Sequence, residues 1–290
     1  MPSRCSRTAA IAVLLGACAP APHDACATPE RTADLPPSLD EASGIAASRS
    51  LDNVIWAHND SEGTAMLYAI DRSGRLLAQM ALPHAGTQFD WEDIAVGPCP
   101  AGDCIYIADI GDNLHRRDDR AILRLTEPAS PASPTSAIER FPIRYPDGPE
   151  DAEAMFITPD TVVYIVTKGR SRAITLYRYP PPLRADERVT LEIVQQLSDG
   201  IVQLPDLVTG ADASPDGSRV AIRTYTRLRL FRFDDTLSAT LPPPGIDLLP
   251  LAEPQGEAVA FLGGDTLLLA TESGPERTQP FLSRVACTIR

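Results

Sequence analysis

Carboxylate and amide side chains stand at the ends of several short apolar segments in this sequence. Glu92, Glu153 and Glu257 each open such a segment, and Asn59 and Asn113 follow others. Carboxylate and amide oxygens are the hard ligands that Ca²⁺ prefers, with water completing the shell. If the fold brings these segments together, the five side chains predict a Ca²⁺ site.

Further charged residues lie at the same segment ends and would share one opening with these ligands. They are Asp60, Asp93, Asp112, Asp212, Arg223 and Glu272. Carboxylates held close together must bind a cation, pair with a base or keep some protons. The alternative is that the acids accept backbone N–H groups at strand starts, or pair with Arg223 and Lys168, and bind no metal.

Two basic side chains are candidates for a catalytic role at the same opening. His58 could act as a general base because imidazole changes charge near neutral pH, although a hydrogen-bonded turn histidine is the alternative. Lys168 is the only lysine among 26 basic residues. A compact, deprotonatable amine is one reason to keep a lysine, and chance is the other. No Gly-x-Ser-x-Gly motif supports serine hydrolase chemistry.

The candidate residues lie within a sequence repeat, and the fold of this repeat determines where they are placed. Five segments open with an acid or small polar residue and continue with alternating apolar residues, at Ser43, Glu92, Glu153, Ala211 and Glu257. They recur every 45 to 60 residues or so, near the period of propeller blades, and further β-rich runs follow each of them after turn residues. The pattern predicts an all-β fold, a β-propeller with five blades of four-stranded antiparallel sheet.

In such a fold the inner strand of each blade begins where its second strand ends. The charged residues above therefore gather at one mouth of the central channel. The last blade lacks a fourth strand of its own, so we expect residues 18–40 to form a tether and a closing strand. Two long intervals leave room for a sixth, degenerate blade around Arg140 or Arg188, which is the alternative count.

The first residues have the features of an export signal. Two arginines precede an apolar stretch too short to span a bilayer, and the stretch ends in Leu-Gly-Ala-Cys18, which resembles a bacterial lipobox. We predict a lipoprotein signal peptide at 1–17, lipidation of Cys18 and a propeller domain at 41–290. The alanine after Cys18 favours an outer-membrane anchor, facing the periplasm or the surface. An ordinary signal peptide, with Cys18 incidental, is the alternative.

Cysteine usage agrees with an oxidising compartment. Of the six cysteines, four remain after removal of the signal peptide and acylation of Cys18. Cys99 and Cys104 flank a short hairpin loop, and Cys26 and Cys287 would join the two ends of the domain, so two disulfides are predicted. Metal binding by Cys99 and Cys104 is the alternative, but no second pair completes a zinc site.

The formal net charge of −13 argues against a nucleic-acid partner, because an acidic surface repels phosphate groups. The arginines between 116 and 124 lie among aspartates and form no basic cluster. We expect a monomer that contacts the membrane through its lipid anchor.

Four sequence motifs resemble those of an uncharacterised family of secreted bacterial β-propeller proteins. They are DWEDIA, IADIGDN, YPDGPEDAEAM and TGADASPDGSRVAIRTY. The chain is more distantly similar to the SdiA-regulated and the SMP-30/gluconolactonase/paraoxonase-like propellers, over nearly all of residues 41–290. The resemblance implies a propeller and, in the lactonase group, a Ca²⁺ in the central channel. A recognisable lactonase catalytic signature is missing, so no activity is implied.

Three functions are compatible with these observations. The first is an envelope-anchored binding module whose acidic mouth holds Ca²⁺ and binds a small molecule, glycan or protein. The second is a Ca²⁺-dependent hydrolase of lactone or phosphoester type, in which His58 or a carboxylate activates water. The third is a structural interaction scaffold with a salt-bridged channel. The fold class alone cannot select among them.

Overall fold

The structure is a computed structural model that describes residues 25–60, 64–82, 90–133 and 137–288. The predicted signal peptide and Cys18 lie outside these residues. Within the described part, no helix has the length and apolar character needed to cross a membrane. The regular elements of the described residues are all β-strands, apart from one 3₁₀ helix, η1 (Leu249–Leu251).

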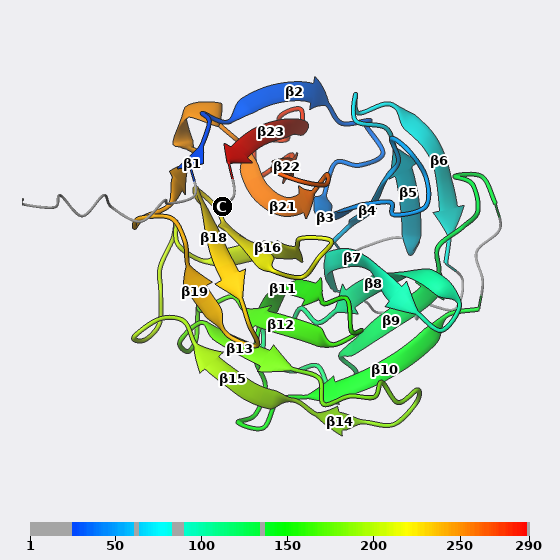
Figure 1. Cartoon of the computed structure of the whole chain (residues 1–290), viewed down its shortest axis with the longest axis vertical. Helices are drawn as coiled ribbons and strands as arrows, with labels where there is room; N and C mark the ends of the chain where they lie inside the picture. The colour runs from blue at the N-terminus through cyan, green and yellow to red at the C-terminus, as the bar shows by residue number, and fades with distance from the viewer. Residues whose placement is uncertain (1–24, 61–63, 83–89, 134–136, 289–290) are drawn as a thin grey trace, which may run out of the picture.

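Five antiparallel sheets surround a central axis as the blades of a propeller (Figure 1). The inner strands are β3 (Ala42–Ala47), β7 (Trp91–Cys99), β11 (Ala152–Ile157), β16 (Val208–Ala213) and β21 (Gln255–Phe261). The second strands are β4 (Ile55–Asn59), β8 (Gly102–Asp109), β12 (Val163–Thr167), β17 (Arg219–Thr224) and β22 (Thr266–Glu272). The prediction of a five-bladed propeller is confirmed, and the described residues form no sixth blade.

The outer strands complete each blade. The third strands are β5 (Met66–Ile70), β9 (Ala121–Thr126), β13 (Thr175–Arg178), β18 (Arg227–Phe233) and β23 (Phe281–Thr288). The fourth strands of the first four blades are β6 (Leu76–Ala81), β10 (Glu139–Arg144), β15 (Glu192–Gln196) and β19 (Leu237–Ala239). Two short additions, β14 (Val189–Thr190) and β20 (Ile246–Asp247), pair with β10 and β18. The segments around Arg140 and Arg188 thus belong to the edge of the second blade.

The fifth blade takes its outer strand from the N-terminal part of the chain. Strand β2 (Glu30–Asp34) pairs antiparallel with β23, and β1 (Ala25–Cys26) pairs with the end of the same strand. In Figure 1, β2 in blue lies beside β23 in red. Because both ends of the domain share one sheet, β2 covers the outer edge of β23 and closes the ring.

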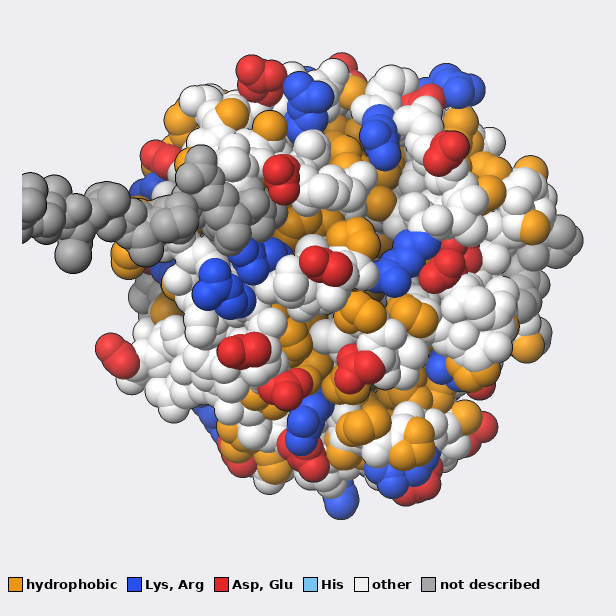
Figure 2. Space-filling view, in the orientation of Figure 1, with side chains coloured by type: hydrophobic (Ala, Val, Ile, Leu, Met, Phe, Trp, Pro, Cys, Tyr) orange, Lys and Arg blue, Asp and Glu red, His pale blue; other side chains and the backbone are white. Residues whose placement is uncertain are grey.

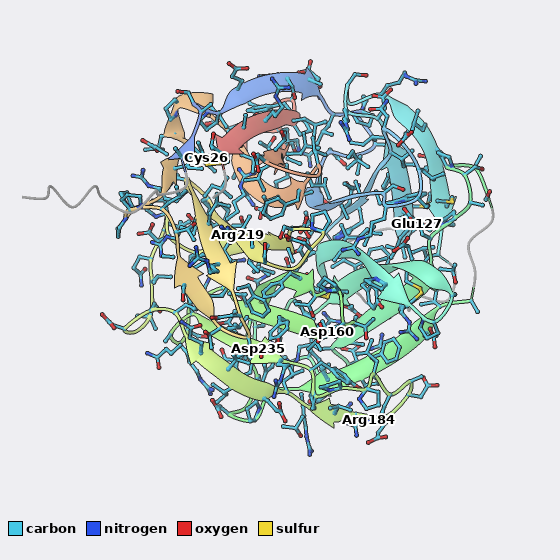
Figure 3. The ribbon with its side chains drawn as sticks, in the orientation of Figure 1. Cys26, Glu127, Asp160, Arg184, Arg219 and Asp235 are labelled. Carbon is cyan, nitrogen blue, oxygen red and sulfur yellow. A yellow bond between two sulfur atoms is a disulfide. The ribbon has the colours of Figure 1, made fainter. Side chains whose placement is uncertain are left out.

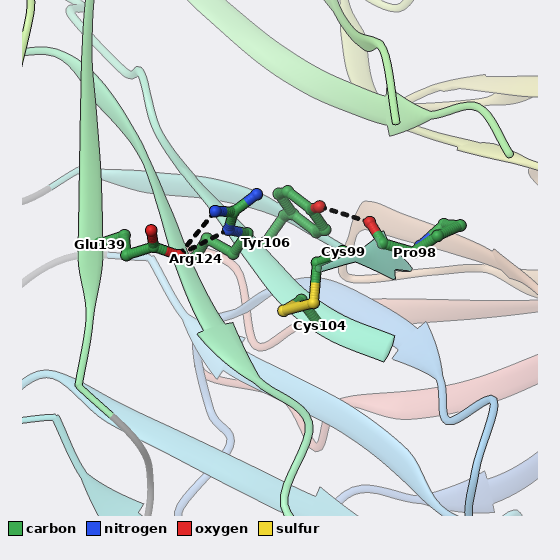
Figure 4. The surroundings of a disulfide bond; sticks show 6 residues. All are labelled: Pro98, Cys99, Cys104, Tyr106, Arg124 and Glu139. Atoms are coloured by element: carbon green, nitrogen blue, oxygen red, sulfur yellow. Dashed lines mark hydrogen bonds and ion pairs between the residues drawn. A yellow bond between two sulfur atoms is a disulfide. The ribbon is translucent and has the colours of Figure 1, made fainter. Parts of the chain in front are cut away.

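Both predicted disulfides are present. Cys26 and Cys287, 261 residues apart in sequence, tie β1 to β23, and Figure 3 shows Cys26 at this joint. Cys99 and Cys104 bridge the turn between β7 and β8 (Figure 4). Beside this second disulfide, the hydroxyl of Tyr106 donates a hydrogen bond of 2.6 Å to the carbonyl of Pro98.

The core lies between neighbouring blades. Each blade is covered on both faces, so inner strands such as β11 bury every residue. Trp56 and Trp91 are completely buried between the first two blades, and Phe156 stacks on Tyr164 in the third. Side chains therefore fill the space around the axis (Figure 3). On the face seen in Figure 2, acidic and basic side chains are interspersed.

Candidate functional site

Each inner strand carries one extra residue at the same position near its start. The register shifts fall at Ala42/Gly44, Trp91/Asp93, Ala152/Ala154, Val208/Gly210 and Gly256/Ala258. Such bulges redirect a side chain away from the sheet pattern. The bulged residues surround one opening of the channel, here called the mouth, and they are Ser43, Glu92, Glu153, Thr209 and Glu257.

The two hydroxyl residues of this set support the glutamates beside them. Ser43 donates to the backbone carbonyl of Glu92, and Thr209 to that of Glu257, each over 2.9 Å. A glycine follows each hydroxyl residue, and a Cβ at Gly210 would lie 2.8 Å from the Glu257 carbonyl. The hydroxyl-glycine pair therefore lets the neighbouring inner strand approach closely.

This register corrects the expected start of the fourth repeat. Thr209, and not Ala211, is the counterpart of the three glutamates, so Asp212 lies three residues further along its strand. Asp212 accepts a 2.8 Å hydrogen bond from the N–H of Phe261, the last residue of β21. It lines a cavity of about 330 Å³ at the opposite opening of the channel. The prediction that Asp212 lies at the mouth is therefore wrong. In the fourth blade the position at the mouth is occupied by the hydroxyl residue Thr209.

Glu92, Glu153 and Glu257 converge although they are far apart in sequence. All three are at most 5% exposed. Glu92 and Glu153 share a hydrogen bond between their side chains, and the charge of Glu153 acts on Glu257. Burial, and then the neighbouring carboxylates, raise the pKa of Glu92 and of Glu257 well above the usual range.

Lys168 follows β12 and pairs with one of these acids. Its ammonium forms an ion pair with Glu153, and both side chains are almost fully buried. Burial by itself lowers the pKa of Lys168, but Glu153 and the other carboxylates outweigh it and raise that pKa. The pair therefore holds Lys168 as an ammonium, which is the opposite of a deprotonated catalytic amine.

A group of three carboxylates at the mouth combines the half-buried Asp60 and Asp90 with the buried Glu92. Asp60 follows β4, Asp90 precedes β7, and their oxygens lie within 4.8 Å of one another and of a Glu92 oxygen. The backbone joins them too, because Trp91 donates its N–H to the carbonyl of Asp60 over 3.1 Å. Burial, followed by the charges of Asp90 and Glu153, raises the pKa of Asp60 to about 8.

Three observations fit a hard divalent cation at this group. Asp60 Oδ1 is buried and has no hydrogen-bond partner among the described residues, and the carboxyl groups of Asp60 and Asp90 share a hydrogen bond. Gly111 leaves room beside the acids, since a Cβ there would come within 2.0 Å of Glu92 Oε1 and 2.6 Å of Asp90. The donors are all carboxylate oxygens, which Ca²⁺ prefers. Asp60, Asp90 and Glu92 are therefore the residues that could hold Ca²⁺.

The two asparagines predicted as ligands differ in what their side-chain oxygens contact. Asn59 donates from Nδ2 to the carbonyl of Ser38 over 3.0 Å, and its Oδ1, the atom that would bind a cation, is buried without a hydrogen-bond partner among the described residues. Asn113 is exposed and accepts a 2.7 Å hydrogen bond from Arg170. Asp90, which the sequence analysis did not place among the ligands, joins the carboxylate group. Its position two residues before Glu92 in the segment DWED is the signal that could have identified it.

His58 is buried behind the mouth. It is 0% exposed, its ring meets Trp91 edge-on at 5.6 Å, and Nδ1 lies 2.9 Å from the carbonyl of Asn59. Burial outweighs its backbone hydrogen bonds and lowers its pKa to about 4. His58 is thus an uncharged packing residue at neutral pH, without access to solvent water.

Asp93 lies deeper along the axis and joins three blades. Its carboxylate accepts backbone N–H groups from Ile94, Met155 and Ala211 at 2.9, 2.8 and 3.1 Å. Burial raises its pKa well above the usual range, and these hydrogen bonds oppose the rise. Asp93 therefore holds the inner strands together and fixes the strand that carries Glu92.

Asp112 and Arg223 hold loops and blades around the mouth. Asp112 pairs with Arg120 and accepts the N–H of Arg116 over 2.7 Å, which orders the loop after β8. Arg223 pairs with Glu253 at the joint of the fourth and fifth blades.

Glu272 stands at the rim, where β22 ends. Burial, then the charges of Glu41 and Glu153, raise its pKa to about 7. A cavity of about 530 Å³ lies between the segment before β3 and the loop after β22, and Ser273, the residue after Glu272, lines it. Asp40, Glu41, Ser273, Arg277 and Thr278 contribute polar groups to that cavity.

Comparisons with protein-family models and with curated proteins find no match. Among solved structures, the chain is similar to a PQQ-bound aldose sugar dehydrogenase from Streptomyces coelicolor. The two share 13% identity over 93% of this chain and 100% of the other, with a TM-score of 0.51. This likeness shows the propeller fold, as the sequence resemblance implied.

Two further solved structures match at lower TM-scores. A gluconolactonase from Xanthomonas campestris is 14% identical over 94% of this chain and 99% of its own, with a TM-score of 0.44. A putative oxidoreductase (glucose dehydrogenase) from Thermus thermophilus is 12% identical over 90% of this chain and 100% of its own, with a TM-score of 0.47.

Proposed function

We propose that this protein is an envelope-anchored binding module that binds Ca²⁺ at the mouth of its channel. The main support for this proposal is the group of Asp60, Asp90 and Glu92, whose oxygens lie within 4.8 Å of one another beside Gly111. Three carboxylates this close, two of which share a hydrogen bond, either keep protons or bind a cation. Calcium outside the cytoplasm is the cation that suits such oxygen donors.

The disulfides support a location outside the cytoplasm, where thiols oxidise. We infer that the chain is tethered through a lipid on Cys18. Its ligand would be a small oxygen-rich molecule or glycan, because the polar cavity lined by Glu41 and Ser273, at about 530 Å³, has the size of small-molecule sites. A bound Ca²⁺ would supply a Lewis-acidic centre for ligand oxygens, while Glu41 and Ser273 would orient the rest of the ligand.

Calcium titration calorimetry on the protein freed of metal by EGTA tests the proposal. We expect one Ca²⁺ per chain and a higher melting temperature with Ca²⁺, since binding to the folded state alone adds about 2.7 kcal/mol at a ligand concentration 100 times Kd. Asp90→Asn should weaken binding ~100-fold by removing one charged ligand. Glu192→Gln, in an exposed ion pair on the outer edge of the third blade, is the control and should bind normally. A wild-type protein that neither binds Ca²⁺ nor melts differently in EGTA would be the scaffold of the third hypothesis.

A hydrolase of lactone or phosphoester type is the second candidate, and Glu272 favours it. A carboxyl group with a pKa of about 7, one residue before the cavity-lining Ser273, can both give and take a proton near neutral pH. Panels of lactones, aryl esters and phosphoesters test this with wild type, Glu153→Gln and Glu272→Gln. Turnover that Glu272→Gln abolishes would establish the hydrolase, whereas a binding module stays inactive in every assay.

A further inference from the structure

Lys168 and Asp60 occupy the same place in two different blades. Each follows the second strand of its blade, and each N–H donates to the residue just before the inner strand, Glu41 for Asp60 and Asp151 for Lys168. Each carbonyl accepts an N–H from the first residue of the next inner strand, Trp91 over 3.1 Å or Val208 over 3.1 Å. The same position of the repeat thus carries a carboxylate in the first blade and an ammonium in the third.

This exchange divides the acids of the mouth into two parts. In one part, Asp60 and Asp90 join Glu92, and all three side chains are acids. In the other part, Lys168 forms its ion pair with Glu153, and its charge also acts on Glu257. The hydrogen bond between Glu92 and Glu153 connects the two parts. The charge of Lys168 also reaches Glu92 and Asp90, and Arg117 acts on Asp90 as well. Among the described residues of the mouth, however, only the Glu153 part holds a cation in a direct ion pair.

The backbone around Lys168 fixes where its ammonium lies. Gly169 follows with a φ of +89°, and a Cβ there would come within 2.5 Å of Ile174 and 2.8 Å of Val202. The turn is therefore tightly packed on both sides, and the lysine side chain leads inward to Glu153 with 6% exposure. An ammonium is a compact point charge with three donors, whereas a guanidinium is a larger planar fork. This difference is consistent with the only lysine of the chain standing at this crowded place.

We propose that Lys168 is a built-in cation that neutralises the Glu153 and Glu257 part of the mouth, and so limits the mouth to one divalent cation, bound by Asp60, Asp90 and Glu92. The inference rests on the proposed function. Lys168 acts on the bound cation through Glu153, so it is a positioning residue and not a ligand. Without its charge, Glu153 and Glu257 would be two uncompensated buried acids beside the first cation, and a second divalent cation would replace the ammonium.

The test is the number of Ca²⁺ ions bound, measured by calorimetry and by metal analysis after gel filtration. We expect one Ca²⁺ in wild type and two in Lys168→Met, which keeps the length of the side chain but not its charge. Arg170→Met, which removes an exposed positive charge two residues later, is the matched control and should bind one. One Ca²⁺ in Lys168→Met, with the wild-type affinity, overturns the inference and leaves the proposed function intact. No Ca²⁺ in wild type overturns both.

A second measurement needs no variant and covers the case in which Lys168→Met does not fold. Because the chain has a single lysine, incorporation of lysine labelled with ¹⁵N at Nζ gives one side-chain ammonium signal by NMR. We expect Ca²⁺ to shift this signal, with the change complete at one equivalent. A signal that stays in place while Ca²⁺ binds would show that the ammonium does not share the mouth with the cation, and would overturn the inference.

Discussion

The guanidinium of Arg223 pairs with the carboxylate of Glu253 inside the joint between the fourth and fifth blades. Arg223 is completely buried and also donates to the carbonyls of Ala258 and Ala270, each over 3.0 Å. Those carbonyls belong to β21 and β22. One side chain on β17 therefore holds the strand that carries Glu257 in place.

Replacing one partner of this pair should destabilise the fold strongly. In Arg223→Met the carboxylate of Glu253 stays buried without its counterion, and we expect a loss of about 3–5 kcal/mol in the free energy of unfolding. Denaturant unfolding measures it. The control is Arg178→Met, which breaks the exposed pair with Glu192 and should cost at most about 1 kcal/mol. Equal losses in the two variants would contradict the role assigned to Arg223.

Gly111→Ala should weaken Ca²⁺ binding. The added methyl group would meet Glu92 Oε1 at 2.0 Å and Asp90 at 2.6 Å, so both carboxylates must move. Displaced ligand groups typically lower metal affinity by about 10–100-fold, and calorimetry would show this. Gly200→Ala is a matched control, because nothing lies within 4 Å of a Cβ there. Normal binding by Gly111→Ala would place the cation elsewhere.

The two disulfides should contribute unequally to stability. Cys26–Cys287 closes a loop of 261 residues, and Cys99–Cys104 closes one of 5. On the chain-entropy account these loops correspond to roughly 5 and 2 kcal/mol. Serine replacement of both cysteines in each pair, followed by thermal unfolding of each double variant, tests the order. A larger loss for the hairpin pair would contradict this account.

Stability should depend on pH through Asp212. Burial raises its pKa in the folded state to about 7, against the backbone hydrogen bonds from Phe261 and Ala213. The folded protein therefore holds a proton that the unfolded chain releases near pH 4. The stability linked to this proton is fully present below that pH and is lost as the pH rises through 7.

Asp212→Asn should accordingly show a flatter change in unfolding free energy between pH 4 and pH 7 than wild type. Asp265→Asn, at an exposed position, is the control, and its unfolding free energy should change with pH as in wild type. An unchanged slope in Asp212→Asn would show that Asp212 does not take up this proton.

Much of the fold follows from periodic features of the sequence. Strand starts at Glu92, Glu153 and Glu257 repeat at blade spacing, and a propeller brings such positions to one opening whatever their distance along the chain. The start of the fourth repeat was assigned to Ala211 and not to Thr209, because Thr209 stands where three other blades have a glutamate. The pair Thr209-Gly210 matches Ser43-Gly44 of the first blade, which occupies the same bulge position.

The composition of the candidate site was harder to predict. Asp60 and Asp90 belong to different blades and meet because Trp91 hydrogen-bonds to the backbone of Asp60. That contact depends on how neighbouring blades pack against each other. The spacing of residues along the sequence does not predict this packing. The role of Lys168 has the same origin, since its equivalence to Asp60 is visible only in backbone pairing.

The sulfur bridge at the ring joint also has a mechanical consequence. Tension applied to the chain ahead of Cys26 passes through that covalent bond directly into β23. The load therefore bypasses the hydrogen bonds of β2, which would otherwise unzip one after another from the edge of the fifth blade. A force on the N-terminus would therefore have to break a covalent bond before it could peel β1 and β2 from the ring.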